Sequence, residues 1–379
     1  MINHTSICLF FLFITFSLPI CAQEYHTSMD VRLFHTPKWV TIAGKPTVYY
    51  ELHLTNFAAD TLQIVGLDIS QGSDSLHLRS FTADALASQM AMKGADNLAC
   101  LSPGSAAVVY LELELALVAG RPPDLLNHRF IYEKTVAGKQ ESRTVDGPAV
   151  SVSPALAVTL GAPLNGGPWI AVSSPVWERG HRRVFYTQNG QARIPGRFAI
   201  DFLLLDNQGK LAMDDQDSLT NWFGFGVDVL AVADATVVSC RNDFQESNTL
   251  SAHTQPTAEQ ATGNYICLRI NSGTYVFYEH LKLGSLRVEP GQQVKKGEVI
   301  ASLGFTGQTS QPHLHFHVAD APSALGAEGL PFTFEAFELL GSFPDVSKLG
   351  RAPWIPNNDN QTKMLFDERP GSNTVIRFD

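Results

Sequence analysis

The first half of the chain alternates apolar and polar residues in short runs that turn residues separate. Alternation with a period of two places every second side chain on the same face of a β-strand. Many short strands of this kind predict an antiparallel sandwich of immunoglobulin-like type over residues 23–160. Within it, only residues 81–93, rich in Ala and Met, are expected to be helical. The clearest alternating runs are residues 47–54, 62–69, 107–115 and 129–133.

A stretch dense in Gly and Pro, residues 161–168, separates this region from a second series of strand-like runs. Gly and Pro interrupt strands and favour turns, so residues 161–175 are predicted to be a linker. The runs that follow contain no helix-length pattern and indicate a second all-β domain over residues 176–335. A C-terminal extension, residues 336–379, ends in an alternating run at 374–378 that is expected to close a sheet edge.

Three histidines alternate with apolar residues in the stretch PHLHFHV, residues 312–318. On a strand, His313, His315 and His317 would share one face, with successive Cα atoms roughly 6.6 Å apart. Two imidazoles at that spacing can meet one metal ion. A solvated strand face would more readily use Thr, Lys or Glu, so the pattern favours a metal or acid–base site.

Composition narrows the functional classes. A chain of 379 residues is long enough for two cores, and a net charge of −10 with 17% charged residues predicts no nucleic-acid partner. Three cysteines lie beyond residue 22, and they form neither a disulfide framework nor a Cys-type zinc site. Cys240 and Cys267 lie in neighbouring strand-like runs, where a disulfide and two buried thiols are both open readings.

An apolar run over residues 7–20 is too short to span a membrane comfortably, and a small residue, Ala22, follows it. We interpret residues 1–22 as a secretory signal peptide, with an uncleaved N-terminal anchor as the alternative. No second apolar run has membrane length. The mature protein is therefore predicted to be exported, periplasmic or extracellular, without a membrane span.

Five motifs follow one another in the second half of the chain: RFAID (197–201), YEHL (278–281), VKKG (294–297), GFTG (304–307) and PHLHF (312–316). Their order resembles that of the lysostaphin-type (LytM) zinc metallopeptidases. The resemblance covers about residues 176–318 and not the N-terminal half. It implies an antiparallel β-domain, Zn²⁺ as cofactor, and hydrolysis of peptide bonds in the cross-bridges or stems of bacterial peptidoglycan.

The resemblance also implies roles for four residues. Asp201 and His315 match zinc ligands, whereas His313 and His280 match the two histidines that orient or deprotonate water and stabilise the oxyanion. A catalytic zinc takes three protein ligands and leaves a position for water, whose pKa it lowers to about 7. Neutral imidazoles beside the metal can exchange protons near that pH.

Arg197 departs from the family pattern, because it stands where the first ligand histidine is expected. A guanidinium has no lone pair to offer a metal. In one reading His317 or His181 completes the zinc shell, and the protein is a metalloendopeptidase. In the other, Arg197 pairs with Asp201 in a metal-poor site, and the domain binds peptidoglycan or activates another envelope hydrolase. Because the other family positions are kept, we favour the enzyme.

Two smaller expectations concern neighbours of these motifs. Glu279 alternates with His280 and is expected on the opposite, solvent-facing side of its strand. Gly304 and Gly307 are expected to shape the turn before the histidine strand rather than to bind phosphate.

Overall fold

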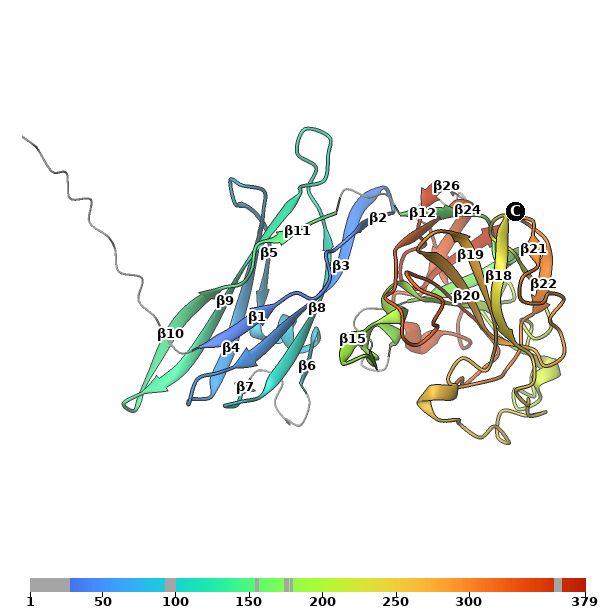
Figure 1. Cartoon of the computed structure of the whole chain (residues 1–379), viewed down its shortest axis with the longest axis horizontal. Helices are drawn as coiled ribbons and strands as arrows, with labels where there is room; N and C mark the ends of the chain where they lie inside the picture. Colours follow the sequence, from blue (N-terminus) through green and yellow to red (C-terminus); the bar gives the residue numbers. More distant parts are fainter. Residues whose placement is uncertain (1–27, 93–99, 154–156, 174–176, 178–179, 358–362) are drawn as a thin grey trace, which may run out of the picture.

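The computed structural model describes residues 28–92, 100–153, 157–173, 177, 180–357 and 363–379. Strands dominate these residues, which confirms the all-β class. Figure 1 shows two bodies, one built from the strands up to β11 and the other from later strands. The predicted signal peptide, residues 1–22, lies outside the described residues. Within the described part of the chain, no helix is long and apolar enough to cross a membrane.

The first body, here called the N-terminal sandwich, consists of two antiparallel sheets that share one hydrophobic core. Inward residues of both sheets, such as Leu52 and Leu67, are fully buried. The immunoglobulin-like topology stays a prediction. One sheet contains β1 (Met29–Arg32), β2 (Trp39–Ile42), β3 (Lys45–Asn56), β6 (Met90–Met92) and β8 (Ala106–Glu114). The other contains β4 (Leu62–Gln71), β5 (Leu76–Thr82), β7 (Cys100–Leu101), β9 (Leu125–Val136), β10 (Lys139–Asp146) and β11 (Val150–Ser151).

The helix expected over residues 81–93 is much shorter in the structure. It begins after the capping residue Thr82, whose hydroxyl accepts a hydrogen bond from Ala85 N, and α1 spans only Ala83–Ala87. Met90 then pairs with Val109 in β8 and buries its side chain in the core of the sandwich. Pairing and burial in the sheet therefore outweigh the helical preference of the Ala- and Met-rich sequence.

The second body is organised around a twelve-stranded sheet, here called the large sheet. Its long path runs β12–β24–β27–β13–β16–β23–β20–β19–β18–β21, and all pairs are antiparallel except β12 with β24. These strands are β12 (Val158–Leu160), β24 (Phe332–Ser342), β27 (Thr374–Phe378), β13 (Gly166–Val172), β16 (Ile200–Leu204), β23 (Leu314–Ala319), β20 (Thr274–Leu281), β19 (Asn264–Asn271), β18 (Ala235–Arg241) and β21 (Gln293–Val294); β25 (Ile355–Pro356) and β26 (Lys363–Glu368) pair with β24.

Short elements complete the second body. Two two-stranded sheets lie outside the large sheet, and single-turn 3-10 helices connect several strands. One is the hairpin of β14 (Tyr186–Gln188) and β15 (Gln191–Arg193), and the other pairs β17 (Asp228–Leu230) with β22 (Val299–Ser302). The 3-10 helices are η1 (His181–Arg183), η2 (Pro195–Phe198), η3 (Leu219–Asn221), η4 (Ala258–Gln260) and η5 (Val346–Lys348).

Two segments predicted to lie outside the second domain are part of its sheet. The predicted linker, residues 161–175, contains β13, because Trp169 and Ile170 lose all solvent exposure by pairing with β16 and β27. The predicted C-terminal extension, residues 336–379, contributes most of β24 and all of β26 and β27. Strand β27 lies between β24 and β13 in the sheet interior, not at an edge. Burial of apolar side chains stabilises both placements.

Candidate metal centre and catalytic cleft

Three adjacent strands of the large sheet bring two carboxylates and an imidazole into one row. His315 on β23 lies opposite Asp201 on β16, and on its other side opposite Glu279 on β20. Directly opposed residues on neighbouring strands project to the same face of the sheet. His315 Nδ1 lies 2.9 Å from Asp201 Oδ1, so the two side chains already share a polar contact.

His181 joins this row from outside the sheet, on the 3-10 helix η1. Its Nε2 atom lies 2.7 Å from Asp201 Oδ2, and its ring centroid lies 4.4 Å from that of His315. Each oxygen of the Asp201 carboxylate therefore contacts an imidazole. The donor atoms of these three residues lie within 4.8 Å of one another.

The charges of these groups suit a cation. Although burial raises the pKa of Asp201, the neighbouring His181 and His313 imidazoles lower that pKa well below its usual value. Burial, followed by the charge of His181, lowers the pKa of His315 to about 4. Near neutral pH, Asp201 is therefore ionised and His315 is neutral, the states in which both groups can give electron pairs to a metal.

The donor set of His181, Asp201 and His315 fits Zn²⁺. Two imidazole nitrogens and one carboxylate oxygen are the ligand types of three-ligand catalytic zinc sites. The described residues hold two further groups of donors within the same 4.8 Å limit, and both include His315: His280 with His313, and Glu279 with His317. Of the three groups, only that of His181, Asp201 and His315 offers an ionised carboxylate near neutral pH. Burial, and then the charge of Asp201, raise the pKa of Glu279 in the third group to about 8.

His317 lies on the other side of the His315 ring. Its Nδ1 atom is 3.2 Å from His315 Nε2, whereas Asp201 contacts the opposite nitrogen, Nδ1. Because the two nitrogens of one imidazole point in different directions, an ion held between Asp201 and His315 Nδ1 is out of reach of His317. The His317 ring stacks on Phe277, with centroids 4.7 Å apart, and its Nδ1 lies 3.6 Å from Glu279 Oε1. His317 thus supports the ring of His315 from behind.

Two further histidines, His313 and His280, face each other beside this set, with ring centroids 4.7 Å apart. Each binds a backbone carbonyl through Nδ1: His313 contacts Gln311 O at 2.8 Å and His280 contacts Thr306 O at 2.7 Å. A carbonyl can only accept, so the ring proton of each neutral imidazole lies on Nδ1 and the lone pair lies on Nε2. His313 Nε2 is buried without a hydrogen bond, 3.4 Å from Asp201 Oδ1.

A β-bulge explains why His280 and Glu279 both face the cleft. Between Tyr278 and Leu281, two residues of β20 oppose one of β19, and His280 has a φ of +62°. A bulge breaks the strict alternation of strand side chains. The expectation that Glu279 faces solvent is therefore wrong, because Glu279 is 4% exposed and lies beside His317.

The turn from Gly304 to Gly307 fixes the acceptor of His280. A Cβ atom on Gly304 would lie 2.3 Å from Lys282 N, and one on Gly307, which has a φ of +82°, would lie 2.3 Å from Ala261 O. Only glycine fits such close backbone approaches. Between them, Thr306 donates its hydroxyl to Leu281 O at 2.9 Å and presents its own carbonyl to His280. The turn shapes the site, in line with the expectation from sequence.

Arg197 does not contact Asp201, contrary to the pairing considered from sequence. Its Nη2 atom lies 2.8 Å from Glu51 Oε2 in the N-terminal sandwich, and its Nη1 atom contacts Glu328 Oε1. Arg197 lies on η2, four residues before Asp201, and its side chain is directed away from the cleft toward the sandwich. Because the buried carboxylate of Glu51 pairs with the guanidinium, Arg197 needs no ion pair with Asp201.

A cleft of about 400 Å³ gives access to these groups. It is lined by His181, Glu279, His280, His315 and His317, together with Tyr186 of the β14–β15 hairpin and with Ala324 and Leu325 of the loop before β24. The described cysteines lie elsewhere, and all three are free thiols. Cys240 pairs with Ile266 and not with Cys267 across β18 and β19, so the structure contains no Cys240–Cys267 disulfide among the residues it describes.

One stretch of the second body matches a known peptidase family. Residues 224–325 match the model of peptidase family M23, so this part of the chain carries a domain of that family. The match includes His280, His313 and His315, whereas Asp201 and His181 precede it.

Known proteins show similarity over limited segments. The peptidoglycan DD-endopeptidase ShyC of Vibrio cholerae serotype O1 is 42% identical over 57 residues, which cover 15% of this chain and 13% of that relative. ShyB of the same organism, also a peptidoglycan DD-endopeptidase, is 45% identical over 56 residues, again 15% and 13%. The catalytic domain of lysostaphin from Staphylococcus simulans is 20% identical, with coverage of 45% of this chain, 88% of that chain and a TM-score of 0.24.

Proposed function

We propose that the protein is an exported zinc metalloendopeptidase that hydrolyses peptide bonds of bacterial peptidoglycan. The arrangement of His181, Asp201 and His315 around one point, with two lone-pair-bearing imidazoles beside it, is the observation that carries this proposal. The match to peptidase family M23 and the peptidoglycan activity of the two Vibrio relatives support the substrate class. The predicted signal peptide supports action in the cell envelope or outside the cell.

In this proposal His181 Nε2, Asp201 and His315 Nδ1 hold the metal, and Arg197 takes no part in its shell. Bound Zn²⁺ would polarise the scissile carbonyl and lower the pKa of a water molecule at the open position. His317 and Glu279 hold the ring of His315 from the opposite side, which keeps its Nδ1 directed at Asp201. The second ligand histidine considered from sequence, His317, is thus given a supporting role.

His313 and His280 carry the proton chemistry. Their Nε2 lone pairs can accept the proton of the attacking water, because backbone carbonyls hold the Nδ1 protons of both rings. The nitrogen that has been protonated then becomes a donor, first to the oxyanion of the tetrahedral intermediate and then to the leaving amine. The fixed tautomers mean that neither ring has to rotate between these steps.

Cross-linked muropeptides incubated with the purified, zinc-loaded chain provide the test. Mass spectrometry should detect products in which one peptide bond has gained one water. A His313→Ala variant should retain zinc, and its hydrolysis rate should fall by about 10²–10⁴-fold, the usual contribution of a general acid–base group. Peptidoglycan that binds the zinc-loaded chain without being cut would refute the peptidase and leave the binding or hydrolase-activating module.

A further inference from the structure

The helix η1 that carries His181 is not part of any sheet. Asp201, His280 and His315 lie on strands whose ladders fix their backbones, whereas η1 is a single turn of three residues. The His181 side chain is 39% exposed, so burial does little to hold it. Its position against Asp201 therefore depends on what anchors the backbone of η1.

The other two side chains of η1 are anchored in the N-terminal sandwich. Arg182 is 5% exposed; its Nε donates to Glu51 Oε1 at 3.0 Å, and its Nη2 donates to the carbonyl of Tyr50. Its guanidinium also lies 4.9 Å from the centroid of the Tyr49 ring. Arg183 donates to Ser88 O at 2.6 Å. Within one turn of helix, two residues contact the sandwich and the third enters the cleft.

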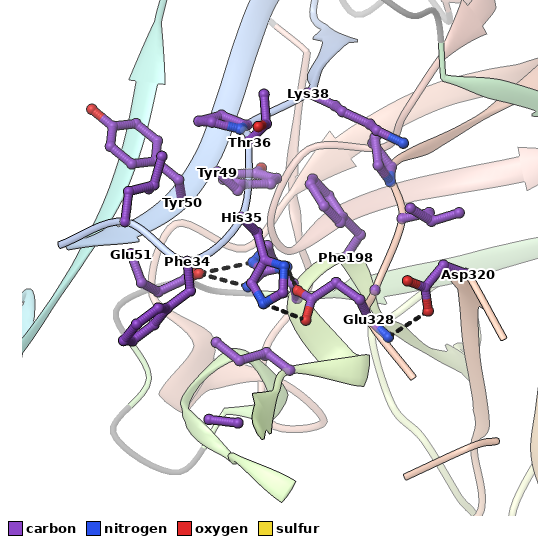
Figure 2. Close-up of a pocket in the computed structure, with 18 of the residues that line it drawn as sticks. Phe34, His35, Thr36, Lys38, Tyr49, Tyr50, Glu51, Phe198, Asp320 and Glu328 are labelled. Atoms are coloured by element: carbon purple, nitrogen blue, oxygen red, sulfur yellow. Dashed lines mark hydrogen bonds and ion pairs between the residues drawn. The ribbon is translucent and has the colours of Figure 1, made fainter. Parts of the chain in front are cut away.

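The carboxylate of Glu51 is the shared centre of this interface. One oxygen accepts from Arg182 and the other from Arg197 of η2. A cavity of about 310 Å³, lined by residues of both bodies, adjoins this carboxylate, and across the same interface His35 Nε2 lies 3.0 Å from Glu328 Oε2 (Figure 2). A buried charge needs its partners, so separation of the two bodies would expose or orphan all of these groups together.

We propose that the N-terminal sandwich completes the metal site of the peptidase domain, with Arg182 as the positioning residue that holds His181 against Asp201. The inference rests on the proposed function, because it assigns His181 to the metal shell. It gives the sandwich a role in the chemistry, although none of the sandwich side chains that the structure describes lines the cleft. Undocking of the sandwich would release η1 and leave Asp201 and His315 as a two-ligand site.

The test is the zinc affinity of the full chain, measured by competition with a chromophoric chelator. Arg182→Ala should weaken zinc binding by roughly 10- to 100-fold, as loss of a group that orients a ligand does. Arg182→Lys should lie between Arg182→Ala and the unmodified chain, because an ammonium keeps the charge but cannot bridge Glu51 and a carbonyl in the planar geometry of a guanidinium. His181→Ala provides the reference for complete loss of the ligand.

His35→Ala is the matched control, because it removes another contact between the two bodies without touching η1. It should bind zinc as tightly as the unmodified chain, and a loss equal to that of Arg182→Ala would overturn the specific role of Arg182. Thermal unfolding of each variant checks the fold. If Arg182→Ala does not fold, the zinc affinity of Arg182→Lys is compared with that of the unmodified chain and of His35→Ala instead.

The outcomes separate this inference from the proposed function. Tight binding in Arg182→Ala combined with weak binding in His181→Ala would overturn the positioning role and leave the zinc site standing. No zinc in the unmodified chain would overturn both. Weakened binding in Arg182→Ala, partial recovery in Arg182→Lys and full binding in His35→Ala would support the inference.

Discussion

Gly196 lies directly against His181 and offers a way to move that residue without changing any polar group. A Cβ atom built on Gly196 would lie 2.6 Å from His181 Cβ and 3.1 Å from His181 O. The contact involves backbone and a Cβ atom, so rotation of a flexible side chain cannot relieve it. A Gly196→Ala substitution must therefore displace η1 from η2.

The size of the displacement follows from the contact distance. Ordinary contact begins at 3.4 Å, so the 2.6 Å approach has to lengthen by about 0.8 Å. A misplacement of about 1 Å in a catalytic group can cost on the order of 10²-fold in rate. Overpacking of this kind also costs about 1–3 kcal/mol of stability. We expect Gly196→Ala to weaken zinc affinity by roughly 10- to 100-fold while the protein remains folded.

Chelator competition and thermal unfolding measure the two effects separately. Gly224→Ala is the matched control, since its added Cβ would meet Leu204 Cβ at 3.6 Å, an ordinary contact. If Gly196→Ala and Gly224→Ala bind zinc equally well, displacing His181 does not change the zinc affinity, and the assignment of His181 as a ligand is refuted.

Three further predictions concern other parts of the chain. His315→Ala should abolish binding of the single zinc expected per chain, whereas His317→Ala should retain it with reduced affinity; equal, complete loss in a metal-content assay would contradict the supporting role of His317. Gly307→Ala should lower turnover and keep zinc, because it disturbs the turn that orients His280, while Gly273→Ala, with a similar φ of +81° and nothing within 4 Å, should leave the ratio of turnover to bound zinc unchanged. Burial lowers the pKa of His128 to about 4, so the stability that its neutral form contributes is fully present above pH 6.5 and is lost as pH falls toward 4, by up to about 3 kcal/mol. His128→Gln should flatten this part of the curve of unfolding free energy against pH, measured by urea unfolding. An unchanged curve would contradict the burial argument.

Local patterns were enough to anticipate the strands and much of the cleft. Period-two alternation predicted that His313, His315 and His317 share a face. In the structure all three are buried, His313 directly before β23 and the other two on it, and donor atoms of both His313 and His317 lie within 4.8 Å of His315. The position of Asp201 one strand away depends on sheet register, which the family resemblance supplied and alternation alone does not.

Two features of the site could not be read from the sequence for physical reasons. The bulge at His280 depends on a left-handed residue that is not glycine, so no local signal marks the point where alternation breaks and His280 joins Glu279 on the cleft face. The position of His181 depends on contacts between Arg182 and Glu51, which are 131 residues apart in sequence. Sequence reasoning kept His181 and His317 as two candidates for the third ligand, because only the folded structure shows that His181 contacts Asp201 whereas His317 lies beside the opposite nitrogen of His315.

The place of β27 in the large sheet has a consequence for the order in which the protein is made. This strand follows every other described strand in the chain, yet it lies between β24 and β13, where Ile376 is fully buried. Until residues 374–378 emerge, β13 has no partner on one side, and the pair that it forms with β16, the strand of Asp201, borders an open edge. Pairing over such long separations in sequence is slow compared with local folding. The cleft is therefore expected to form only after the chain through Phe378 has been produced.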